Sequence, residues 1–266
     1  MKKSRSFLGV MILAVLLLSG AADVSAASTM DKIVRSGKMV IAVQTQGPPV
    51  SFVNRDGVRT GLAIEIARLM AEDMGVELVI QDYDWKGLIP ALLSGKADLI
   101  AADMTPTAKR HMKVVFTQPM FYLENIAYAK KKRDFTSWKD LDQPGRSVGA
   151  TQASSYADVA RRFLPKARLK EYAGGNPQTF QAVVAGRVDA GISDRAFVSG
   201  ALTENTDIEV LEGVISKEPL SFAVRPDSMH LLFALNNYVR LISLDGRLDK
   251  LVDYWWNSTA WTADHK

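Results

Sequence analysis

Cysteine is the one residue type that this 266-residue sequence lacks altogether. Without cysteine the chain forms no disulfide, holds no iron–sulfur cluster, has no thiol nucleophile and carries no lipid on an N-terminal cysteine. Histidine is scarce as well, and the three histidines show no spacing typical of metal ligands. The sequence therefore predicts no metal site, no cofactor and no thiol catalysis.

A strong excess of charge of one sign is also missing. The 33 basic and 29 acidic residues leave a formal net charge of +4, and the short basic run at 130–133 is typical of a solvated surface. Nucleic acid is therefore not an expected partner. With 47% hydrophobic and 23% charged residues the composition is that of a folded globular protein, long enough for one large domain or two small ones.

Long hydrophobic runs are absent except at the N-terminus. Basic residues at 2, 3 and 5 precede twelve apolar residues at 7–18, and small residues end at Ala26. This three-part pattern is typical of a secretory signal peptide, and the apolar run is shorter than the roughly 20 residues of a membrane span. Cleavage after residue 26 would leave 266 − 26 = 240 residues. We expect residues 1–26 to be this signal peptide and the mature protein, which is no lipoprotein, to be soluble in the periplasm.

Strand-like and helix-like segments alternate along the mature chain. Residues 39–43 and 76–80 are short apolar runs typical of strands, and 61–74 has helical spacing and ends at Gly75. The pattern continues with a helix at 88–93, a strand at 97–101, a helix from about Pro106, and apolar runs at 114–116, 126–129 and 147–150. Such alternation indicates the α/β class.

A unit of the first half recurs in the second half. Residues 92–103 align with 183–194: a helix ends at glycine, a basic residue and an aspartate follow, and a second aspartate comes five residues later. These second aspartates are Asp103 and Asp194. The repeat predicts two α/β lobes, and ligands of open α/β sheets bind beyond the carboxyl ends of the strands. If the lobes face each other, both carboxylates look into one cleft.

The residues around these strand ends could hold a zwitterion. Thr105 before Pro106 is typical of a helix N-cap, Arg110 follows in the first turns, and Ser155 with Asp158 resembles a capping box. Helix N-termini and arginine attract carboxylates, while Asp194, alone or together with Asp103, would attract an ammonium group. This is the charge layout that an α-amino acid needs, although a solvated arginine and capping aspartates would give the same pattern.

Taken in order, these and other motifs resemble the bacterial extracellular solute-binding proteins of family 3, the periplasmic polar amino-acid binders of ABC importers. The matching motifs are 37–43, 48–52, 56–57, 60–62, 84–98, 104–110, 115–119, 186–194 and 244–255. The resemblance implies a two-lobed type II, or Venus-flytrap, fold with a cleft and two crossover strands, near 123–125 and 220–222. It implies a first lobe of 27–123 and 222–266 and a second lobe of 124–221.

The resemblance also implies roles for particular residues. Arg110 matches the arginine that binds the ligand carboxylate, Asp194 the aspartate that accepts the ammonium, and Thr105 a hydroxyl on the same carboxylate. Trp85 matches a position that packs on the ligand, and Ser154 and Ser155 match the second-lobe loop that closes over it. We expect the side chain of the ligand to be enclosed by Gln44, Trp85, Asp103, Thr151 and Tyr156.

Four positions depart from the family pattern. Gly47 and Val50 replace aromatic residues, Ala153 replaces glycine, and Asp103 stands where glycine or serine is usual. The Asp103 carboxylate would either favour a cationic ligand or cap the helix after it. Both readings stay open at this point.

The expected function is substrate binding for an ABC importer. A monomer would capture a polar L-amino acid or related zwitterion by lobe closure and bind an inner-membrane permease transiently. The alternative is a periplasmic cyclohexadienyl (prephenate or arogenate) dehydratase, because those enzymes share the fold and resemble the chain at 142–145. We expect their catalytic acid three residues after the Asp194 position, where this chain has Phe197, which cannot donate a proton.

Overall fold

The computed structural model describes residues 28–44, 47–131 and 134–265. The predicted signal peptide lies outside these ranges. The first helix described, α2 (Thr29–Ser36), begins with a capping box between Ser28 and Asp31 and ends at Gly37, which has a φ of 64°. Within the described ranges, no helix combines the length and the apolar character that a membrane crossing needs.

Three parallel strands form the sheet of the first lobe, in the order β4, β1, β5. The strands are β1 (Lys38–Gln44), β4 (Glu77–Tyr83) and β5 (Leu99–Met104), accompanied by the short pair β2 (Phe52–Val53) and β3 (Arg59–Thr60). The helices are α3 (Leu62–Met74), η1 (Trp85–Gly87), α4 (Leu88–Leu93) and α5 (Ala108–His111). The helices predicted at 61–74 and 88–93 and the strand at 39–43 are confirmed.

The second lobe repeats this construction with three more parallel strands, in the order β10, β8, β9. Its strands are β8 (Ser147–Thr151), β9 (Arg168–Tyr172), β10 (Ala190–Asp194) and β11 (Ile208–Val210). Its helices are η2 (Trp138–Leu141), α6 (Ser155–Phe163), α7 (Asn176–Val184) and α8 (Arg195–Leu202). Parallel strands connected by helices explain the apolar runs in the sequence, because both faces of such a sheet are covered.

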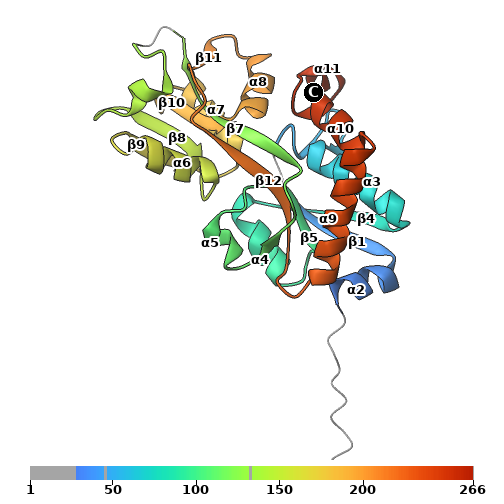
Figure 1. The fold of residues 1–266 in the computed structure, drawn as a ribbon. Helices are drawn as coiled ribbons and strands as arrows, with labels where there is room; N and C mark the ends of the chain where they lie inside the picture. Colours follow the sequence, from blue (N-terminus) through green and yellow to red (C-terminus); the bar gives the residue numbers. More distant parts are fainter. Residues whose placement is uncertain (1–27, 45–46, 132–133, 266) are drawn as a thin grey trace, which may run out of the picture.

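Two long strands join the lobes, as Figure 1 shows. They are β7 (Phe121–Lys130) and β12 (Ser216–Val224), which pair antiparallel from Phe121–Leu220 to Asn125–Ser216. β12 also pairs with β5 and with β6 (Val115–Phe116), while β7 continues beside β10. Both predicted crossover segments lie in these two strands, which join ten of the described strands into one continuous curled sheet, while β2 and β3 pair separately.

The C-terminal helices pack on helices from the first part of the chain. They are α9 (Met229–Leu244), α10 (Arg247–Trp255) and α11 (Ala260–His265), and α10 contacts α3. Trp255 and Trp261 pack against Phe52. The ring centroid of Phe52 lies 6.1 Å from that of Trp255 and 5.5 Å from that of Trp261. Trp261 also touches the second lobe, since a Cβ placed on Gly200 of α8 would lie 2.6 Å from the Trp261 ring.

The internal repeat has a structural counterpart in the first aspartate of each copy. Asp98 exchanges two hydrogen bonds with Val40 of β1: its backbone N–H donates to the Val40 carbonyl and its carboxylate accepts from the Val40 N–H. Asp189 makes the same pair of bonds with Ser147 of β8. In each lobe the aspartate therefore fixes the strand after a helix against its parallel neighbour.

Three local predictions are wrong. The cap of α5 is Thr107 instead of Thr105, because the Thr107 hydroxyl accepts the Arg110 N–H while the Thr105 hydroxyl bonds to Glu218. The cap of α6 is Ser154 rather than Ser155, so no capping box with Asp158 forms. The apolar side chains of Met104 and Met112 predict two core positions; Met104 is buried, but Met112 is 87% exposed.

We predict that Asp98→Ala destabilises the protein. The substitution leaves the part-buried Val40 N–H without its acceptor and removes the ion pair with Lys32, which should cost about 1–3 kcal/mol and lower the Tm by about 5 °C. Asp98→Asn keeps one acceptor and should lose less than half as much. Thermal unfolding followed by circular dichroism measures both, and equal losses in the two variants would contradict this role of the carboxylate.

Candidate ligand-binding site

A polar cavity lies where the carboxyl ends of strands from both lobes meet. Its lining combines first-lobe residues at the ends of β1, β4 and β5 with second-lobe residues that follow β8 and β9: Gln44, Trp85, Asp103, Thr151, Ser154, Ser155, Tyr156 and Asn176. The volume open to the centre of a water molecule is only about 10 Å³, which is room for about one water molecule. The two walls are therefore closed on each other.

Asp194 accepts hydrogen bonds from residues that form the second-lobe wall of the cavity. One carboxylate oxygen accepts the Phe197 N–H at 2.7 Å and so caps α8; the other accepts the Tyr156 hydroxyl at 2.9 Å and the Asn176 amide at 3.2 Å. Asn176 in turn accepts the Thr151 hydroxyl at 2.8 Å. Asp194 is 1% exposed and does not line the cavity, whereas the groups that it holds do.

Burial and hydrogen bonding act in opposite directions on Asp194. Loss of solvent raises the pKa of its carboxyl, and the hydrogen bonds from Phe197 and Tyr156 lower it; the effect of burial is larger. The pKa of the Tyr156 phenol is raised well above its usual value, first by burial and then by the charge of Asp194. Tyr156 therefore remains a protonated donor at neutral pH.

Asp103 lines the cavity from the first lobe, near the end of β5. Among the described residues, none makes a hydrogen bond or ion pair with its side chain. Burial raises the pKa of its carboxyl well above the usual 3.8, the negative charge of Asp194 adds to the rise, and Arg110 opposes it. Since Thr107 caps α5, the reading of Asp103 as a helix cap is wrong.

Three hydrogen bonds close the lobes over the cavity. The Trp85 indole N–H and the Arg110 Nη2 both donate to the carbonyl of Ala153, at 3.0 and 3.3 Å. The hydroxyls of Thr105 and Ser155 lie 3.2 Å apart, and Thr105 donates to Glu218 of β12 at 2.7 Å. The three bonds to Ala153 and Ser155 are the ones that must break when the cleft opens.

Ala153 holds an unusual backbone conformation in this closing loop. Its φ of 59° lies in the left-handed region, where glycine is favoured, and the sequence comparison with the family had marked it as a replacement for glycine. Its N–H donates to Glu171 at 3.1 Å, and Arg161 bonds to Glu171 as well. These contacts point the Ala153 carbonyl at Trp85 and Arg110.

Arg110 lies at the rim rather than inside the cavity. Its Nη1 donates to the Thr105 carbonyl at 2.8 Å, and its guanidinium carbon lies 5.3 Å from the centre of the Trp85 ring. Within the described part of the chain it has no carboxylate ion-pair partner. Burial lowers the pKa of this guanidinium, and Asp158, Glu218 and Asp103 raise it; arginine keeps its charge in either case.

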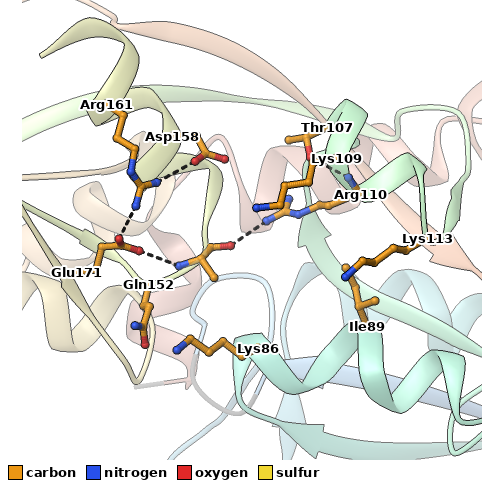
Figure 2. A pocket seen from close by; sticks show the side chains of 11 residues that line it. Lys86, Ile89, Thr107, Lys109, Arg110, Lys113, Gln152, Asp158, Arg161 and Glu171 are labelled. Atoms are coloured by element: carbon orange, nitrogen blue, oxygen red, sulfur yellow. Dashed lines mark hydrogen bonds and ion pairs between the residues drawn. The ribbon is translucent and has the colours of Figure 1, made fainter. Parts of the chain in front are cut away.

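A groove of about 620 Å³ surrounds Arg110 outside the cavity, as shown in Figure 2. First-lobe lysines lie on one side of it and second-lobe charges on the other: Lys86, Lys109, Lys113, Asp158, Arg161 and Glu171. In Figure 2 Arg161 lies between Asp158 and Glu171, with ion pairs to both. The guanidinium of Arg110 is thus reachable from solvent through a polar opening.

The structure brings most of the predicted site residues together. Seven of the ten line the cavity: Gln44, Trp85, Asp103, Thr151, Ser154, Ser155 and Tyr156. Thr105 does not line the cavity but bonds to Ser155, which does. Arg110 lies at the rim, and Asp194 bonds to the lining residue Tyr156 without lining the cavity itself. Their roles in ligand binding remain predictions.

Sequence reasoning missed Asn176 and Glu218. Asn176 begins α7 directly after two glycines that follow strand β9, so it stands at the same sheet edge as Thr151, and that pattern could have revealed it. Glu218 lies within a crossover strand, and nothing local marks it as a partner of Thr105. In the part of the chain that the structure describes, no group of three or more histidine or acidic residues is arranged to hold a metal ion.

A two-lobed α/β fold with a closed polar cavity between its lobes defines the class of periplasmic-type binding proteins. Residues 39–258 match the model of the bacterial extracellular solute-binding proteins, family 3, and the chain belongs to that family. It is 25% identical over 255 residues to the L-cystine-binding protein of Escherichia coli K12, covering 96% of each chain. It is 28% identical to the ABC transporter arginine-binding protein 1 of the same strain, covering 92% of this chain and 98% of the relative.

A solved structure shares the fold over most of the chain. The ancestral amino acid-binding protein AncCDT-1, described as a precursor of cyclohexadienyl dehydratase, superposes with a TM-score of 0.80 at 32% identity. The match covers 86% of this chain and all of that one. The two-lobed fold expected from the sequence is confirmed.

We predict that Asp103→Asn stabilises the ligand-free protein as the pH rises. The raised pKa means that the folded protein holds this proton more tightly than the unfolded chain does. Stability is therefore lost as the pH rises from the usual value of 3.8 through the raised pKa, and asparagine escapes this loss. The Tm difference between variant and wild type should be small near pH 4 and reach about 3–6 °C near pH 8.

Thermal unfolding across that pH range, in matched ionic strength, measures the difference. Asp194 titrates in both proteins, and in the variant it is relieved of repulsion by the Asp103 charge, which adds to the expected gain in stability. A variant that is less stable than wild type at every pH would contradict the prediction.

Proposed function

We propose that the protein captures a polar L-amino acid, or a related zwitterion, between its lobes and presents it to an ABC permease of the inner membrane. The observation that carries this proposal is the closed polar cavity at the strand ends of both lobes, with Arg110 at its rim and aspartates on both sides. Arginine binds carboxylates through two parallel hydrogen bonds, and carboxylates accept ammonium groups. The named binding activities of the relatives support the same class of ligand.

Closure is the step that a ligand would control. The closed cavity has room for about one water molecule, so an amino acid enters only when the walls separate. A ligand carboxylate on Arg110 would replace the carbonyls of Thr105 and Ala153 as its acceptors, and hydroxyls of the second lobe would complete the contacts on closing. Binding then shifts the open–closed equilibrium because the ligand contacts both lobes only in the closed form.

The hinge is proposed to lie in the paired crossover strands. With a first lobe of 27–123 and 222–266 and a second lobe of 124–221, both boundaries fall inside β7 and β12. Small dihedral changes in two adjacent strands can rotate one lobe while the ladder between them stays intact. We place the protein in the periplasm as a monomer that meets its permease transiently.

The protein is proposed to be a binding protein without enzymatic activity. A dehydratase on this fold needs a proton donor near the leaving group, and the position three residues after Asp194 is Phe197, which is buried and packs edge-to-face on Phe180. Glu171 is engaged by Arg161 and the Ala153 N–H, and Glu204 is exposed beyond the end of α8. Neither carboxyl lines the inner cavity.

The proposal is tested by thermal shift and titration calorimetry of the mature protein against the L-amino acids, polyamines and prephenate. A single group of amino acids should raise the Tm, with affinities near micromolar, which corresponds to about −8 kcal/mol. Arg110→Ala should weaken that binding about 100-fold, because the carboxylate of the ligand loses a desolvated charged partner.

Lys109→Ala is the matched control, since it removes a neighbouring cation of the outer groove but makes no bond to the closing loop. Its affinity should stay within about threefold of wild type. Absence of binding to every amino acid, together with turnover of prephenate, would overturn the proposal in favour of the dehydratase.

A further inference from the structure

The cavity holds two aspartates whose environments differ completely. Asp194, the residue that the family resemblance assigns to the ligand ammonium, already accepts hydrogen bonds from Phe197, Tyr156 and Asn176. Both of its oxygens are engaged, and Tyr156 and Asn176 stand between it and the cavity. A ligand cation could reach Asp194 only by displacing part of this network.

Asp103 presents the opposite arrangement. Its side chain lines the cavity, and no described residue donates a hydrogen bond to it. It is the one carboxylate among the eight described residues that line the cavity. The charged and titratable groups whose electrostatic influence reaches it are Asp194 from β10, Arg110 from α5 and the Tyr156 phenol from α6.

An ionised carboxylate in such a place is costly until a cation joins it. Desolvation and the neighbouring negative charge both oppose ionisation, and a hydrogen-bonding cation offsets both. Arg110 cannot serve as that cation in the closed form, because its Nη groups donate to the carbonyls of Thr105 and Ala153. Without ligand, Asp103 is neutralised by a proton, as its raised pKa favours; when it ionises in the closed form, the compensating positive charge has to come with the ligand.

We propose that Asp103, and not Asp194, binds the cationic group of the ligand, an ammonium or guanidinium, inside the closed cavity. This inference rests on the proposed function as an amino-acid receptor and adds a specificity-determining residue to it. Asp194 is then a positioning residue, which aims the Tyr156 hydroxyl and the Asn176 amide into the cavity. Arg110 and Asp103 lie seven residues apart on the segment from β5 to α5, so one segment of the first lobe supplies both charges for a zwitterion.

The cationic group that Asp103 binds could be either the α-ammonium of the ligand or a cationic side chain. Three probes separate them: L-lysine carries both groups, L-norleucine lacks the side-chain ammonium, and Nα-acetyl-L-lysine lacks the α-ammonium. An Asp103→Asn effect on L-lysine and Nα-acetyl-L-lysine alone identifies the side chain. An effect on L-lysine and L-norleucine alone identifies the α-ammonium.

Titration calorimetry compares wild type with Asp103→Asn, Asp103→Ser and Asp194→Asn, each checked for folding by circular dichroism. Both Asp103 variants should bind the best cationic probe about 100-fold more weakly, since each removes a desolvated charge partner. Asp194→Asn should lower the Tm but change the affinity less than tenfold. The matched control is Asp158→Asn, which removes a carboxylate of the outer groove and should leave the affinity within about threefold.

At a pH between the usual 3.8 and the raised pKa of Asp103, binding should release a proton from Asp103 in wild type, and this release should be missing in Asp103→Asn. The carboxyl with the raised pKa ionises when the cation arrives, so the observed heat should depend on the ionisation enthalpy of the buffer. The inference is overturned if Asp103→Asn binds every probe as tightly as wild type, or if Asp194→Asn alone abolishes binding in a folded protein. If wild type binds no amino acid at all, the proposed function has failed and this inference fails with it.

Discussion

The antiparallel pairing of β7 with β12 is the constraint on which the rest of the structure depends. The paired strands carry the chain from the first lobe to the second and back. Three strands of each lobe are parallel, so their carboxyl ends meet at one edge, and the crossing strands make these two edges face each other. The cavity, the closing loop and the part-buried guanidinium of Arg110 at the rim all follow from this meeting of strand ends.

Charge is distributed unevenly across the closed cleft. Asp194 is stabilised by an N–H, a hydroxyl and an amide and serves as the anchor of a hydrogen-bonded wall. Asp103 has no such support among the described residues, and Arg110 contacts only backbone carbonyls and an aromatic ring. In the ligand-free protein the Asp103 carboxyl and the Arg110 guanidinium thus form no ion pair with each other. This lowers the stability of the ligand-free protein and favours a ligand that carries both complementary charges.

Many of the helices and strands and the two-lobed construction could be predicted from the sequence, because they depend on patterns among residues that are close together in the chain. Periodicity located α3, α4, β1 and β8, and the repeated glycine–aspartate unit predicted two lobes of the same construction. Contacts between distant segments could not be predicted in this way. The Thr105 hydroxyl bonds to Glu218, 113 residues further along the chain, so the expected cap at Thr105 was wrong. The Tyr156 hydroxyl bonds to Asp194, 38 residues away in sequence, and no local pattern indicates this contact.

The contact between Gly200 and Trp261 lies on the second-lobe helix α8, which begins at the Asp194 cap. Trp261 belongs to α11 and packs on Phe52 of the first lobe, so it touches both lobes at once. Rotation about the crossing strands must slide or separate this contact whenever the cleft opens or closes. The indole of Trp261 is therefore an intrinsic optical reporter of lobe movement, built into the last helix of the chain.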